Sequence, residues 1–123
     1  DWTEEDFESL TRWLNGFEHP IVNIQPVTPM PRTPLYDRMR DIVRVPREEH
    51  ALYDMAHLLW QPEHLSVRRY YWLILRTYYR TMASFRGQLY IVRRYGLTSY
   101  LRVFRGMVHI TGQYLTLCAR GRL

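Results

Sequence analysis

The spacing of apolar side chains over the first seventeen residues predicts an amphipathic helix. Its polar face is acidic, and Thr3 stands where an N-cap is expected, with Asp6 at the capping-box position three residues later. The apolar face consists of Phe7, Leu10, Trp13, Leu14 and Phe17. Residues 1–17 are therefore expected to form an acidic helix that docks through this face.

A proline-rich arm is expected after this helix. Five prolines fall within residues 18–34, and they exclude both a helix and a central strand. A connection of this length without secondary structure is unusual in a compact domain and is often functional.

The remaining residues, 35–123, predict a helical core. Thr33 and Pro34 fit the N-cap and first position of a short helix, and a 3.6-residue rhythm predicts further helices over 46–60, 65–85 and 98–119. Residues 88–95 fit either a short helix or a strand; we favour the helix, ended by Gly96, because no other segment offers a partner strand. The prediction is an all-α domain with about five helices around one core.

The two longest predicted helices each carry an apolar face and an arginine-bearing face. In the first, the apolar positions are Val67, Tyr71, Ile74, Tyr78, Met82 and Phe85. Arg69, Arg76 and Arg80 fall opposite, within about 40° of one another on a helical wheel, and Trp72 and Tyr79 flank them.

The last predicted helix has a broader apolar face. We assign this face to the core; its members are Leu97, Tyr100, Leu101, Val103, Phe104, Met107, Val108, Tyr114, Leu115 and Cys118. Arg102, Arg105 and His109 lie opposite.

The length of 123 residues fits one domain spanning residues 1–123. The single Cys118 cannot form an internal disulfide, so a reducing compartment is expected, and no apolar run is long enough to span a membrane. The chain begins with Asp1 and no leader pattern precedes the helix. We therefore expect a piece of a longer or processed chain that is intracellular, cytoplasmic or nuclear, and not secreted.

Charge is divided sharply along the chain. All seventeen basic residues are arginine, which suggests either a need for the planar guanidinium fork or avoidance of lysine as an acceptor of ubiquitin and acetyl groups. All twelve acidic residues lie within residues 1–63, which carry a net charge of −6, whereas residues 64–123 carry eleven arginines and no acid. Since the acidic half cannot neutralise all of this charge, an external anion is expected.

Eleven aromatic residues are interleaved with these eleven arginines, a pattern that suits phosphates and unpaired bases. About two thirds of the aromatic side chains are needed for the core. The candidate nucleic-acid or anion-binding residues are Arg68, Arg69, Arg76, Arg80, Arg93, Arg94, Arg102, Arg105, Trp72 and Tyr79. Trp2, Phe7 and Trp13 are candidate contacts to a protein partner.

Catalysis, cofactors and metals find little support in the sequence. His50, Asp54 and His57 would share a helix face, but no cysteine joins them, and a solvated helix face explains them. Cys118 falls on an apolar face, and no glycine-rich phosphate loop is present. We expect no catalytic residue, no metal and no cofactor.

These features favour a non-enzymatic binding or assembly module, interpreted as a viral structural or accessory protein that self-assembles and binds nucleic acid or another polyanion. An alternative is a lysine-free adaptor that recruits host proteins through its helical surface. A weaker alternative is a matrix-like domain on anionic membrane.

Overall fold

Four α-helices make up most of the protein in a computed structural model that describes residues 2–17, 22–83 and 85–121. They are α1 (Glu4–Asn15), α2 (Pro34–Met39), α3 (Val67–Met82) and α4 (Phe85–Arg120), with a short 3₁₀ turn at His50–Leu52. Within these described ranges no strand forms, and one isolated β-bridge joins Val43 to Trp60. The predicted all-α class is confirmed, although the count of five helices is not.

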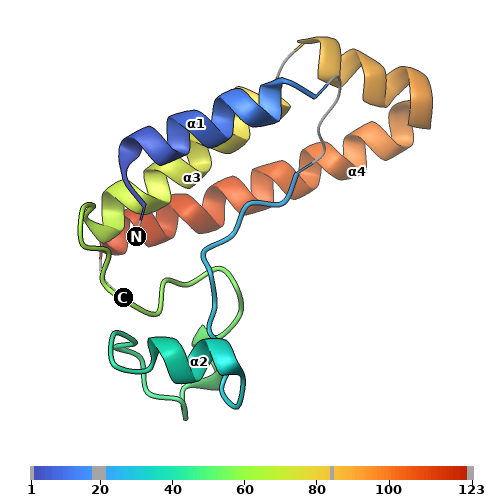
Figure 1. Cartoon of the computed structure of the whole chain (residues 1–123). Coiled ribbons are helices and arrows are strands. Elements are labelled where there is room, and N and C mark those ends of the chain that lie inside the picture. The colour runs from blue at the N-terminus through green and yellow to red at the C-terminus, as the bar shows by residue number, and fades with distance from the viewer. Residues whose placement is uncertain (1, 18–21, 84, 122–123) are drawn as a thin grey trace.

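Helix α3 is the centre of the fold, because α1 packs on one side of it and α4 on another (Figure 1). Tyr71, Leu73 and Ile74 in its middle are each only 1% exposed. The contacts of α1 advance along α3 in the same direction, so these two helices are parallel, whereas α4 returns antiparallel. The nine buried residues of α3 are Val67, Tyr70, Tyr71, Leu73, Ile74, Leu75, Thr77, Tyr78 and Thr81.

The predicted starts of the first two helices are confirmed. Thr3 and Asp6 form a full capping box at α1, and the Thr33 side chain caps α2, with Pro34 in the first position. Ser66 caps α3 by accepting a hydrogen bond from the Arg69 backbone N–H at 3.1 Å.

The helix predicted over residues 46–60 does not form, and this prediction is wrong. The Asp54 carboxylate accepts hydrogen bonds from the backbone N–H groups of Ala56 at 2.9 Å and His57 at 3.0 Å, which holds a turn. Met55 adopts a left-handed conformation with φ 63°, which a helix does not allow. Leu58 and Leu59 of this segment are buried, both 0% exposed, and they directly precede Trp60, which forms the β-bridge.

The described part of the proline-rich arm, residues 22–33, has no regular secondary structure, as predicted, and residues 18–21 lie outside the described ranges. The arm is fixed to α3 by the Tyr78 hydroxyl, which accepts from the Ile24 backbone N–H at 2.6 Å and donates to Asn23 Oδ1 at 2.8 Å. Pro26 and Pro29 are buried.

Helix α4 contains a sharp break at Gly96, where φ is 81° and ψ is 165°. The break divides α4 into a short arm, 85–95, and a long arm, 97–120, which correspond to the last two predicted helices. Figure 1 shows the short arm extending from the end of α3 before the long arm runs back along α3. Phe85, predicted as core, is 81% exposed.

The buried hydroxyl of Tyr71 generates a stability prediction. It accepts a hydrogen bond from the Leu58 backbone N–H at 2.7 Å, so Tyr71→Phe leaves a buried donor unpaired. We expect the free energy of unfolding to fall by about 1–3 kcal/mol in urea denaturation. The exposed control Tyr79→Phe should change it by less than about 0.5 kcal/mol. Equal losses in the two variants would contradict the assigned role.

Candidate binding surface

Three of the predicted anion-binding arginines form ion pairs with α1. Arg69 binds Glu4 through two hydrogen bonds, from Nε at 2.7 Å and from Nη2 at 2.8 Å. Glu8 accepts hydrogen bonds from both Arg76 and Arg80, the second at 2.6 Å. The acidic helix thus neutralises the arginines that share a face of α3.

These contacts act on the carboxyl groups as well. The hydrogen bond from Arg80 lowers the pKa of Glu8 below its ordinary value, and the hydrogen bond from Arg69 lowers the pKa of Glu4. Both carboxylates remain ionised to lower pH than they would in the unfolded chain, so the docking of α1 is coupled to their charge.

Arg68 has a different role, because its guanidinium hydrogen-bonds the last carbonyl groups of α4. Its Nε donates to the Cys118 carbonyl at 3.1 Å, and its Nη2 reaches the Ala119 carbonyl at 3.5 Å. A positive charge at this place also complements the dipole at the helix C-terminus. Arg68 therefore ties the start of α3 to the end of α4.

The other four predicted arginines lie on α4 and are exposed. Arg93 and Arg94 lie on the short arm, where the Arg94 guanidinium lies 5.8 Å from the ring centroid of Tyr95, and Arg102 and Arg105 lie on the long arm. Within the part of the chain that the structure describes, no acidic side chain forms an ion pair with any of these four.

The apolar face predicted for the last helix is split in two, and only one part reaches the core. Tyr114 is buried against α3, at 3% exposed, and so is Leu117, at 4%, which the prediction had not included. A second row stands in solvent with exposed fractions of 48–61%; we call it the outer stripe, and it consists of Leu97, Leu101, Phe104, Val108 and Leu115. The assignment of these five residues to the core was wrong. The unusual width of the predicted apolar face was the signal that it serves two surfaces.

The outer stripe lies between aromatic residues of α3 and a basic edge of α4. On one side, the Tyr79 hydroxyl hydrogen-bonds Thr111 Oγ1 at 2.9 Å, and Trp72 and Tyr79 are 46% and 45% exposed. On the other side, a helical wheel places Arg105 about 80° and Arg102 about 140° from Leu97. Arg105 thus lies next to the exposed apolar side chains of the stripe, whereas Arg102 lies farther round the helix.

The three candidate partner contacts near the N-terminus differ in accessibility. Phe7 is 3% exposed and belongs to the core, whereas Trp13 is 63% exposed and packs edge to face on Phe17 at 4.8 Å. Trp2 is 39% exposed and packs against Phe7 at 5.0 Å.

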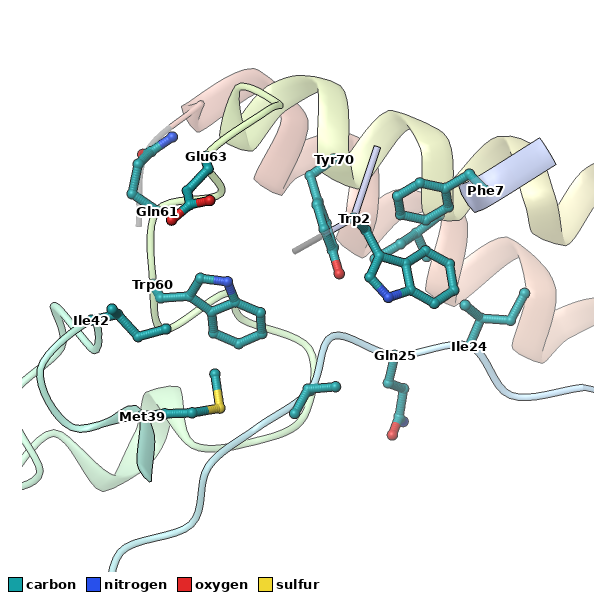
Figure 2. Close-up of a pocket in the computed structure, with 12 residues that line it drawn as sticks. Trp2, Phe7, Ile24, Gln25, Met39, Ile42, Trp60, Gln61, Glu63 and Tyr70 are labelled. Atoms are coloured by element: carbon teal, nitrogen blue, oxygen red, sulfur yellow. The ribbon is translucent and has the colours of Figure 1, made fainter. Parts of the chain in front are cut away.

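Trp2 and Phe7 also line a cavity of about 340 Å³ between α1, the arm and α2. Figure 2 shows them with Tyr70 on one wall and Trp60, Met39 and Ile42 across the open space. The lining is predominantly apolar, with Gln25, Gln61 and Glu63 as its polar members.

The geometry offers little for catalysis or metal binding. Asp54 and His57 are paired with each other, Nδ1 to Oδ1 at 3.0 Å, and do not share a helix face with His50. Over the residues whose placement is described, no group of three histidine, cysteine or acidic side chains is arranged to hold a metal ion. Burial raises the pKa of the Cys118 thiol, which disfavours the nucleophilic thiolate.

None of the described helices has the length and apolar character needed to cross a bilayer. No protein-family model matches this chain, and no curated protein or solved structure matches it either. The surface itself is therefore the basis for a functional proposal.

The ion pairs of α1 generate a prediction about pH. Because the pKa of Glu8 is lowered on folding, its stabilising contribution is fully present above the unfolded value of about 4.5 and is lost as pH falls through the lower folded value. Glu8→Gln should lower the melting temperature at neutral pH, and the difference from the original protein should shrink below pH 4.5.

The matched control is Glu5→Gln, since the described residues contain no ion pair with Glu5. This neighbouring substitution should leave the pH profile of the melting temperature nearly unchanged. A Glu8→Gln protein that loses stability with acid as steeply as the original would refute the assigned coupling.

Proposed function

We propose that the protein is a non-enzymatic binding module that engages an acidic macromolecule through the outer face of α4, and that this macromolecule is a protein. The observation that carries the proposal is the exposed outer stripe with Arg105 at its edge and Arg102 farther round the same helix. Protein interfaces combine an apolar centre with arginine and aromatic residues. Tyr79, which hydrogen-bonds Thr111 of α4 and is 45% exposed, supplies an aromatic component.

Nucleic acid is the second candidate, and the Arg93–Arg94–Tyr95 cluster favours it, since arginine and tyrosine together suit phosphates and unpaired bases. The outer stripe argues against it, because contacts to phosphate gain little from leucine and valine. Anionic membrane is a third candidate: an apolar row with a basic edge also fits the interface of a bilayer.

The absence of lysine supports the adaptor form of the proposal. A protein that recruits others without lysine offers no side-chain acceptor for ubiquitin. A viral accessory protein with this role remains part of the same proposal.

The test compares three probes: labelled polyglutamate, a labelled single-stranded oligonucleotide and vesicles of anionic lipid. We expect polyglutamate to bind at low salt, and Arg102→Glu with Arg105→Glu to weaken its binding about ten-fold in fluorescence anisotropy, because two attractive contacts become repulsive.

The matched control is Arg40→Glu with Arg47→Glu, which changes the net charge equally at exposed arginines away from α4. This double variant should retain most of the affinity. Binding confined to the oligonucleotide or to the vesicles would assign α4 to that partner instead, and binding to none of the probes would refute the proposal.

A further inference from the structure

The contact between α1 and α3 shows how this fold recognises an acidic amphipathic helix. The apolar residues Phe7 and Leu14 of α1 are buried, and Thr11 Oγ1 lies 3.3 Å from Thr77 Oγ1 of α3. Beside this strip, Glu4 and Glu8 bind the arginines of α3. The receptor surface of α3 thus consists of an apolar strip with a row of arginines along one edge.

The long arm of α4 also has an apolar strip and a neighbouring arginine, and no described part of the chain covers the strip. The first four residues of its outer stripe are spaced by four, three and four, and Leu115 follows seven later, so all five lie within about 60° on a helical wheel. Arg105 lies about 80° from Leu97 on the wheel, so a positive charge stands along one edge of the stripe. At 1.5 Å per residue, the stripe from Leu97 to Leu115 is about 27 Å long, or about five helical turns.

We propose that the outer stripe of α4 is the docking site for an acidic amphipathic helix of a partner protein. This inference rests on the proposed function and specifies the partner. Apolar residues of the partner cover Leu101, Phe104 and Val108, and a carboxylate at the edge of the partner's apolar face pairs with Arg105.

Charge favours this partner over a second copy of α4. Residues 64–123 contain no acidic side chain, so two copies of α4 paired through their stripes would bring arginines together without a carboxylate between them. An acidic helix instead supplies the negative charge that this half of the chain lacks. It also covers apolar surface that solvent contacts in the isolated chain.

The experiment uses the full chain and a labelled peptide of residues 3–17 as the acidic amphipathic probe. A scrambled peptide of the same composition keeps the charge and removes the apolar face. We expect the ordered peptide to bind at least about ten-fold more tightly than the scrambled one by fluorescence anisotropy. Leu101→Ser with Phe104→Ser should reduce its affinity to the level of the scrambled peptide.

Two controls make the result specific. Both substituted positions are half exposed, so the variant should retain the circular dichroism spectrum and melting temperature of the original chain. If the peptide instead displaces α1 from α3, its affinity will not change when Leu101 and Phe104 are substituted. That outcome would overturn the inference. A dimer seen by light scattering and abolished by the same substitutions would also overturn it, because the occupant would be a second copy.

Failure of this inference is separable from failure of the proposed function. If polyglutamate binds through Arg102 and Arg105 but the ordered peptide binds no better than the scrambled one, the helix-docking inference is wrong and the acidic-partner function stands. If neither polyglutamate nor the peptide binds, both are wrong.

Discussion

The burial of α3 between two helices is the constraint on which the rest of the structure depends. Nine of its sixteen residues are buried, yet it also carries Arg69, Arg76 and Arg80. A helix with these two properties needs an apolar partner that brings negative charge, and α1 supplies both through Phe7 and its glutamates. The acidic start of the chain therefore helps to cover α3. The division of charge along the sequence thus contributes to the packing of α1 on α3.

Among the described residues, however, no carboxylate pairs with Arg93, Arg94, Arg102 or Arg105. Glu4 and Glu8 neutralise arginines of α3, while Arg68 is held by carbonyl groups at the end of α4. The positive charge left on α4 stands beside apolar side chains. The surface for which we propose a partner is therefore one that the described acidic side chains do not neutralise.

The sequence predicted the helices whose ends carry strong local signals: Thr3, Thr33 and Ser66 cap three of them, and Gly96 breaks the fourth. It misassigned residues 46–60, because a 3.6-residue rhythm does not reveal that Asp54 holds a turn or that Leu58 and Leu59 are buried next to a β-bridge. The arginines were predicted to bind anions. Which of them form ion pairs within the described part of the chain depends on which glutamates of α1 lie opposite them in the fold. That arrangement is a tertiary property, and so is the exposure of Phe104 and Val108.

Gly96 divides the long fourth helix into two arms that point in different directions. Its φ of 81° with ψ of 165° lies in a region that side-chain-bearing residues avoid, although no atom would crowd a side chain there. Glycine adopts this conformation without strain, so Gly96 is the residue that permits the bend. The short arm carries Arg93 and Arg94, and the long arm carries the outer stripe. A side chain at position 96 would strain the backbone between the two arms, so the relative direction of these two sets of residues depends on a single glycine.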